Sequence, residues 1–402
     1  MRKKLKLLLS NLNQGLIARE QTVKLALLTL LAGENILLVG PPGTGKSYIA
    51  RRMADSLAGD DQQAEDYFEY LLTKFSTPEE IFGPLSISEL KQDRFKRNTA
   101  GYLPTVKTAF LDEIFKSSSS ILNSLLTILN ERVYHNGAEV QPVPLRALIA
   151  ASNELPTEQA DLSALYDRFL VRVFVDYVPE HEREHFFRPF EIFELQPSLC
   201  ITGAELAQIA TTAAQVEIPA EVAKAIQQIW IKHKEAFKED RRESLSDRRL
   251  VKVIQLLRVS SATNGRKKMN LSDVLLLKDC LWNHQDNAEQ VMTIIQKELD
   301  TAAIEFVEKT LEPLVEMVEN THQKATEIAT FKPVFSQKYG SLGLSMAQKK
   351  TIERQEKEQK DLEKLHEQKL KEFVQEKKAR AHLKKQKSTE LLTNQLQANI
   401  WI

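Results

Sequence analysis

Residues 35–50 read NILLVGPPGTGKSYIA, and this stretch decides the fold. NILLVG is a short continuous apolar run, which is typical of a strand buried on both faces of a parallel sheet. A turn of the pattern GxxxxGK[ST] follows, in which glycines let successive backbone N–H groups face one anion. The helix after it adds the positive end of its dipole. The residues of this predicted phosphate-binding turn are Gly40, Pro41, Pro42, Gly43, Thr44, Gly45, Lys46 and Ser47.

The turn predicts that the chain binds ATP together with Mg²⁺. We expect Lys46 to reach the β- and γ-phosphates and the Ser47 hydroxyl to bind the metal. A second acidic site is needed, and the run FLDE at 110–113 supplies it. Asp112 would hold Mg²⁺ through water, and Glu113 would polarise the attacking water as general base. We expect the strand that carries both acids to neighbour the strand before the turn.

Three further polar residues complete the predicted site, and two of them have an alternative. Asn153 closes the apolar run ALIAASN, where a neutral amide can orient water or contact the γ-phosphate, although asparagine also simply forms turns. Arg168 precedes another apolar run, and its planar, always-charged group suits the phosphate of a neighbouring copy. Arg172 is the alternative for that role. Arg248 is expected to report the γ-phosphate to the second domain, with Arg249 as the alternative and plain surface charge as the simpler explanation.

Apolar runs alternate with helical patterns in the first half of the chain, which predicts a parallel α/β sheet with right-handed crossovers. A helical pattern at 5–32 ends at Gly33 and indicates two amphipathic helices. The predicted strands after the first are FEYLLTKFS (68–76), VKTAFLDEIF (106–115), RALIAASN (146–153) and FLVRVFVDYV (169–178).

Beyond about residue 190 the patterns are helical, and Thr202, Ser246 and Ser272 are expected as N-caps. The predicted fold is therefore an α/β nucleotide-binding core, an all-α lid domain and a long helical C-terminal extension. The expected domains are 1–188, 189–290 and 291–402. Residues 348–387 are rich in Lys, Glu and Gln, and they favour a solvated helix over a rigid docking arm because their apolar seam is thin.

Composition argues against whole-chain attraction to nucleic acid or anionic lipid. Lys+Arg and Asp+Glu both number 55, so the formal net charge is zero. The two cysteines, Cys200 and Cys280, lie far apart and suit a reducing compartment. The basic start MRKKLKLLLSNLNQ has too short an apolar run for a signal peptide, and no apolar run reaches the length of a membrane span. We expect a cytoplasmic protein.

These motifs resemble AAA+ ATPases of the MoxR branch, most closely its RavA type, over roughly residues 10–285. The stretches that carry the resemblance are GPPGTGKS, FSTPEEIFGPLSI, GYLP, FLDEIFK, ILNSLLTILNER, NGAEV, AASNELP, ALYDRFL, SDRR and LLLKDCLW. The resemblance implies a hexameric ring with ATP between subunits, and a chaperone-like role with a von Willebrand factor A-domain partner.

The resemblance also implies a role for each site residue. Lys46 and Ser47 fall on Walker A, and Asp112 and Glu113 on Walker B. The remaining assignments are Asn153 as sensor 1, Arg168 as the arginine finger and Arg248 as sensor 2. A β-hairpin is expected before sensor 1, at 133–143.

One motif points elsewhere. HEREH at 181–185 fits the zinc-peptidase pattern HExxH. It follows a proline inside a charged run at the junction of two domains, so we interpret it as a solvated helix.

Three functions stay open at this stage. The leading one is an ATPase that remodels or matures protein partners. The second is a nucleic-acid motor or loader, which would need basic residues on the hairpin, where the sequence has His135 and Glu139. The third is a slow scaffold that works by nucleotide-dependent assembly.

Overall fold

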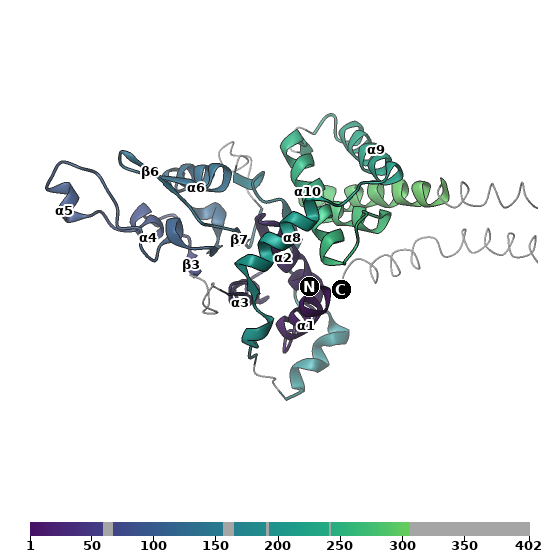
Figure 1. Cartoon of the computed structure of the whole chain (residues 1–402), viewed down its shortest axis with the longest axis horizontal. Coiled ribbons are helices and arrows are strands. Elements are labelled where there is room, and N and C mark those ends of the chain that lie inside the picture. The colour runs from purple at the N-terminus through teal and green to yellow at the C-terminus, as the bar shows by residue number, and fades with distance from the viewer. Residues whose placement is uncertain (59–66, 156–164, 190–192, 241–242, 306–402) are drawn as a thin grey trace, which may run out of the picture. The chain divides into compact units, whose positions relative to one another are not determined.

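The structure is a computed structural model that describes residues 1–58, 67–155, 165–189, 193–240 and 243–305 (Figure 1). Residues Met1–Glu298 belong to one compact unit, and a second unit begins at Leu299. The first unit contains a parallel sheet made of β1 (Ile36–Val39), β3 (Tyr67–Leu71), β4 (Thr108–Asp112), β7 (Ala147–Ser152) and β8 (Val171–Phe174). The strand order is β3-β4-β7-β1-β8. The parallel α/β sheet that the sequence predicts is confirmed.

The central strands are buried because their sequences are apolar without interruption. All four residues of β1 and all six of β7 are buried. Such strands carry no polar face for solvent, so helices must cover both sides. Contacts from α2 (Glu20–Ala32) and α3 (Lys46–Asp55) reach β7.

The strand order corrects one expectation. We expected β4, with its two acids, to neighbour β1, but β7 lies between them. Val39 of β1 is in register with Ser152 of β7, and Leu111 of β4 is in register with Ala150. Every connection in a parallel sheet is a long crossover, so succession along the chain does not fix which strands become neighbours.

The two N-terminal helices are confirmed as α1 (Arg2–Leu12) and α2. Gly33 ends α2 in the left-handed conformation at φ +72°. Its N–H donates to the carbonyl of Leu30, and the N–H of Glu34 donates to that of Thr29. Glycine adopts this geometry at little cost, and the turn delivers the chain directly into β1.

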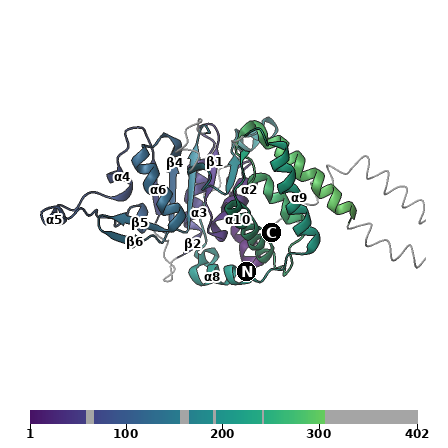
Figure 2. The ribbon, with the colours of Figure 1, turned by 90° about the horizontal axis from the view of Figure 1, so that it is seen from above.

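The expected hairpin at 133–143 is present as β5 (Val133–Asn136) and β6 (Glu139–Pro142). It lies beside the segment that carries α5 (Ile87–Leu90), because the Asn136 side chain accepts from the N–H and donates to the carbonyl of Arg97. This segment extends away from the sheet (Figures 1 and 2). The other elements between β3 and β7 are α4 (Pro78–Phe82), η1 (Leu103–Thr105), η2 (Ile114–Lys116) and α6 (Ser119–Glu131).

A small parallel pairing escapes sequence analysis. β2 (Leu57–Ala58) pairs with β9 (Ile201–Thr202) just before the helical region, although we expected no strand beyond about residue 190. Two residues are too few for a periodic pattern to appear. The 3₁₀ helices η3 (Glu180–Phe187) and η4 (Pro197–Leu199) lie between β8 and β9 along the chain.

The helical region consists of α8 (Gly203–Ala214), α9 (Ala220–Ala236), α10 (Asp247–Thr263), η6 (Leu271–Asp279) and η7 (Gln285–Asn287). In this region α10 packs against α2 and α8, and α9 packs against η6. Thr202 and Ser246 are N-caps as expected, each accepting from a backbone N–H of the first turn. The Ser272 prediction is wrong, since Asn270 caps η6 and Ser272 lies within it.

The chain continues from η7 into a helix that begins at residue 288 and extends to 305, the last described residue. The predicted Lys/Glu-rich helix at 348–387 lies outside the described residues. Among the described helices, none combines the length and apolar character needed to cross a membrane.

A buried histidine lies in the helical region, close to a buried carboxylate. His233 of α9 is 1% exposed, and its Nε2 lies 3.8 Å from the Glu243 carboxylate. That carboxylate already accepts the backbone N–H groups of Asn283 and His284. Burial lowers the pKa of His233 from 6.5 to about 4.

We therefore predict that stability falls as the pH drops from 6.5 to 4. In this window the unfolded chain binds a proton that folded His233 does not, which costs the folded state up to about 3 kcal/mol. Thermal melts of His233→Phe should show a weaker acid dependence than the wild type, with exposed His135→Gln as control. An equal acid dependence in all three proteins would contradict the assignment.

Candidate nucleotide site

The phosphate-binding turn leaves β1 at the edge where the strands end. Gly43 and Gly45 adopt left-handed backbone conformations at φ +78° and +87°, and Gly45 is the N-cap of α3. Gly40 is held against the chain that continues β8, where a Cβ would lie 2.1 Å from the carbonyl oxygen of Val175. Any side chain at residue 40 would therefore displace the backbone that positions the turn.

The Lys46 side chain folds back onto the phosphate-binding turn. Its side chain is buried, and Nζ donates to the carbonyl oxygens of Gly40 at 2.7 Å and Pro41 at 2.9 Å. Nζ also donates to Oδ1 of Asn153 at 3.3 Å. Burial lowers the pKa of Lys46, and the nearby carboxylates of Asp112 and Glu113 oppose that shift. The ammonium thus lies where the turn, the acids and Asn153 converge.

Asp112 is the last residue of β4 and Glu113 follows it, so the two acids end the strand as expected. Glu113 has a left-handed backbone at φ +53°, which is uncommon for a non-glycine residue, and its side chain is nearly buried. Its carboxylate accepts a hydrogen bond from Nδ2 of Asn153 and lies 3.3 Å from Nζ of Lys116. Asn153 therefore contacts Lys46 with its oxygen and Glu113 with its nitrogen.

The residues suit a bound Mg²⁺. Burial raises the pKa of Asp112, and the positive charge of Lys46 opposes the shift. A cation beside Asp112 would offset the cost of keeping this partly buried carboxylate ionised. Ser47 lies in the first turn of α3 and supplies a hydroxyl. Oxygen ligands of this type are those that Mg²⁺ prefers, so Ser47 and Asp112 are the residues that would hold it.

Sequence analysis missed Arg19, whose buried side chain donates hydrogen bonds to the backbone of the turn and of the chain after β8. Its Nε donates to the carbonyl of Thr44 at 3.0 Å, and its two terminal nitrogens donate to the carbonyls of Ala18 at 2.8 Å and Asp176 at 2.6 Å. Arg19 is 8% exposed. It precedes α2 with no motif around it, so the only available signal was a charged residue at the start of a mostly apolar helix.

Arg168 lies at the opposite edge of the sheet, where the strands begin. It precedes β8, and its carbonyl accepts from the Asn35 side chain just before β1. Its guanidinium is 20% exposed and lies 3.9 Å from Asp167. Arg172, the alternative finger, is fully buried inside β8 and donates to the carbonyls of Trp282 and Tyr166. Arg172 therefore cannot serve a neighbouring copy.

The helical region brings Arg248 to the same edge as Arg168. Arg248 donates to Oδ1 of Asn130, near the end of α6, at 3.0 Å. Burial is the main cause that lowers the pKa of Arg168, and the positive charge of Arg248 is the next. Arg248 is thus far from the phosphate-binding turn of its own chain, and its predicted contact with a γ-phosphate stays a prediction. The alternative, Arg249, is only 3% exposed and points into the protein.

Two family models match the chain. The model of the MoxR domain in MoxR-vWA-beta-propeller ternary systems matches residues 3–205, and the AAA lid domain matches residues 221–295. This chain belongs to the MoxR family of AAA+ ATPases. The placement of the phosphate-binding turn, the acids and the lid agrees with that membership.

Relatives of this MoxR protein include two uncharacterized proteins of Methanocaldococcus jannaschii. One is 39% identical over 287 residues, covering 71% of this chain and 73% of the relative. The other is 37% identical over 300 residues, covering 73% of each. The crystal structure of an ATPase candidate from Cytophaga hutchinsonii has a TM-score of 0.58 at 17% identity, covering 74% of this chain and 94% of that one, which shows a shared fold.

The HExxH motif of this MoxR protein lies on η3, an exposed 3₁₀ helix. At three residues per turn, His181 and His185 point about 120° apart, whereas an α-helix would align them on one face. The predicted solvated position is confirmed, although the winding is 3₁₀. Among the described residues no cluster of three metal-ligating side chains occurs.

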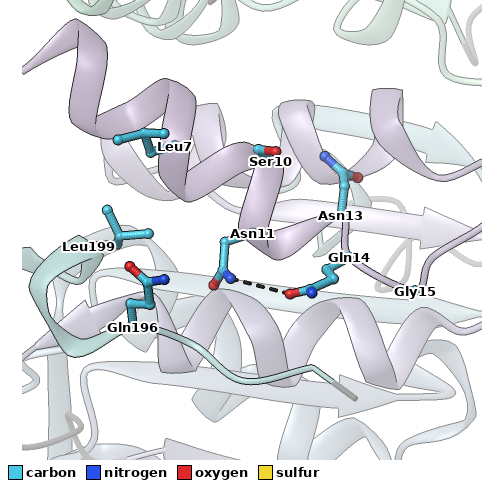
Figure 3. A pocket seen from close by; sticks show the side chains of 8 residues that line it. All are labelled: Leu7, Ser10, Asn11, Asn13, Gln14, Gly15, Gln196 and Leu199. Carbon is cyan, nitrogen blue, oxygen red and sulfur yellow. Dashed lines mark hydrogen bonds between the residues drawn. The ribbon is translucent and has the colours of Figure 1, made fainter. Parts of the chain in front are cut away.

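A separate hollow lies beside α1, with a volume of about 540 Å³ (Figure 3). Its floor is rich in amides, and the Asn11 side chain donates to that of Gln14 across it. None of its lining residues belongs to the phosphate-binding turn or the acids, so it is distinct from the nucleotide site. The lining residues are Leu7, Ser10, Asn11, Asn13, Gln14, Gly15, Gln196 and Leu199.

We predict that Arg19→Met weakens ATP binding by about tenfold without unfolding the protein. A buried guanidinium that holds three carbonyls is worth more than the ~1.4 kcal/mol that a tenfold change in affinity requires. Equilibrium titration with a fluorescent ATP analogue measures the effect.

The matched control is Arg51→Met on the exposed side of α3. Arg51 forms a surface ion pair with Glu69 at 2.8 Å, and such pairs contribute little to stability. Equal affinity for Arg19→Met and Arg51→Met would show that Arg19 does not organise the turn.

Proposed function

We propose that this MoxR protein hydrolyses ATP in composite sites between the subunits of a hexameric ring, and that the cycle remodels or matures a protein partner. Each site combines the phosphate-binding turn of one subunit with Arg168 of the next. The helical lid moves as nucleotide binds and leaves, which makes the output mechanical.

The position of Arg168 carries this proposal. Lys46 lies in the turn that follows the end of β1. Arg168 lies just before the start of β8, and β8 is a neighbour of β1 in the sheet. The four residues of β1 alone separate the two edges by roughly 13 Å. Arg168 is therefore out of reach of the phosphates bound by its own chain. Its remaining exposure at that edge suits contact with the nucleotide of a neighbouring copy.

The chemistry follows from the contacts at the turn. Glu113 is the general base, and Asn153 holds its carboxylate next to Lys46. An attacking water would form hydrogen bonds with Glu113 and Asn153 while Lys46 contacts the phosphate oxygens. Arg168 of the neighbour then stabilises the charge that develops on the transferred phosphoryl group. When bound by Ser47 and Asp112, Mg²⁺ supplies charge neutralisation on the phosphate oxygens.

The matching family model supports the class of partner. Its description places such MoxR domains in systems with vWA and β-propeller proteins. We therefore propose a von Willebrand factor A-domain protein as partner, in the cytoplasm. The RavA type stays a prediction from the sequence motifs.

The charges beside the hairpin favour a protein client over nucleic acid. The segment that carries α5, which we call the arm, lies beside the hairpin and contains basic residues. Three of these form ion pairs at 2.8–3.0 Å: Arg94 with Glu89, Lys96 with Glu139 and Arg97 with Glu79. The same arm exposes large apolar side chains at Ile87, Leu90 and Phe95. Apolar side chains suit contact with protein better than contact with phosphates.

We predict that two inactive variants restore activity when mixed. Lys46→Ala removes phosphate contacts but keeps Arg168, while Arg168→Ala does the reverse and should lose about 10³-fold in turnover. In a random equal mixture, about a quarter of the head-to-tail interfaces combine an intact turn with an intact finger. Phosphate release from the mixture should rise far above that of either variant alone.

Assembly is checked in the same samples by light scattering. Lys252→Met, which removes an ion pair with Glu34 at 2.5 Å just before β1, serves as an active assembled control. Co-assembled rings that remain inactive would overturn the composite site.

We predict that Glu113→Gln binds ATP but stalls before hydrolysis, because the amide cannot accept the proton from water. In ATP this variant should retain a vWA-domain partner in a pull-down that the wild type releases. A slow scaffold would instead keep full activity in a functional assay with Glu113→Gln, and that result would replace the remodelling function.

A further inference from the structure

A buried polar cluster joins the core to the lid at the edge that presents Arg168. Arg249 of α10 donates to Oδ1 of Asp167 at 2.6 Å and to Oδ1 of Asn283 at 2.6 Å. Arg172 of β8 donates to the same Asn283 oxygen at 2.9 Å and lies 4.2 Å from the Tyr166 ring centroid. Both guanidinium groups are almost entirely buried.

Joining two domains through buried charged groups carries a high desolvation cost. Burial and the positive charge of Arg172 lower the pKa of Arg249 to about 10. Apolar side chains of similar volume often hold such an interface at least as well as a buried ion pair does. A buried pair of fixed geometry, however, sets the position and orientation of the groups next to it.

The groups next to the pair are the two arginines at the subunit edge. Asp167 precedes Arg168, and its other oxygen lies 3.9 Å from the Arg168 guanidinium. Arg249 follows Arg248 in the first turn of α10. The pair therefore joins the backbone that carries Arg168 in the core to the backbone that carries Arg248 in the lid.

We propose that Arg249 and Asp167 are positioning residues for the finger, so that the docking of the lid on its own core controls hydrolysis in the neighbouring subunit. This rests on the proposed function. Arg168 and Arg248 form a two-arginine group whose spacing depends on the buried pair. A lid that shifts away breaks the pair and moves Arg168 from its place.

Mixed rings test this directly, with Arg249→Met as the variant. We expect kcat to fall about 100-fold with little change in KM for ATP, which is typical when a catalytic group is displaced by about 1 Å. Arg249→Met should regain activity when mixed with Lys46→Ala, whose fingers are intact. It should not regain activity with Arg168→Ala, because both variants then lack a placed finger.

The opposite pattern overturns the proposal. Rescue by Arg168→Ala but not by Lys46→Ala would mean that Arg249 acts on the nucleotide of its own chain. Failure with both partners in assembled rings would indicate a general structural role and also overturn it. If Lys46→Ala and Arg168→Ala fail to rescue each other, the composite site itself is wrong, and that failure is visible separately.

Three further variants sharpen the result. Lys252→Met removes another core–lid ion pair, in which Lys252, one helical turn after Arg249 on α10, contacts Glu34 at 2.5 Å instead of the Asp167 carboxylate. It should keep near wild-type turnover, and a loss equal to that of Arg249→Met would overturn a specific role for Arg249. If Arg249→Met does not assemble, Asp167→Asn, of nearly equal volume, carries the same mixing test. Arg249→Lys should recover only part of the loss, because one ammonium cannot hold both Asp167 and Asn283.

Discussion

The strand β7 between β1 and β4 is the constraint on which the site depends. It brings Asn153 to the point where the phosphate-binding turn and the acids face each other, so that one amide contacts both Lys46 and Glu113. An ammonium must meet the amide oxygen and a carboxylate must meet the amide nitrogen. The side chain is thereby fixed without adding charge. Apolar sequence in β7 holds this amide rigidly, because the strand is buried along its whole length.

The same parallel sheet separates the two halves of the chemistry. All five strands end at the nucleotide edge and begin at the edge that holds Arg168 and Arg248. In the proposed ring, a single chain presents an incomplete site at each edge, and head-to-tail contact between copies would complete both. The lid joins this arrangement through Arg249, which is buried against Asp167. Under the proposed function, residues adjacent in sequence would link hydrolysis between subunits to movement of the lid within one subunit.

Local sequence predicts the parts that depend on local chemistry. The strands, the turn around Lys46, the acids after β4 and the caps at Thr202 and Ser246 follow from apolar runs, glycines and capping residues. The strand order does not follow, because crossover connections leave neighbours undefined. The contacts of Arg19 and Arg249 could not be predicted for a related reason, because each bonds to groups that are distant along the chain. Sequence analysis missed Arg19 and named Arg249 only as the alternative to Arg248. The nearness of Arg248 to Arg168 could not be predicted either, because it depends on how the lid packs on the core.

We propose above all that the turn at 40–47, Asp112 and Glu113 form a single ATP site in this chain. Calorimetric titration of ATP in the presence of Mg²⁺ tests it most directly, with wild type compared with Lys46→Ala and with Asp112→Asn. We expect one site per chain in the wild type, no measurable binding for Lys46→Ala, and binding by Asp112→Asn that no longer depends on Mg²⁺. Unchanged affinity in a folded Lys46→Ala protein would contradict the account.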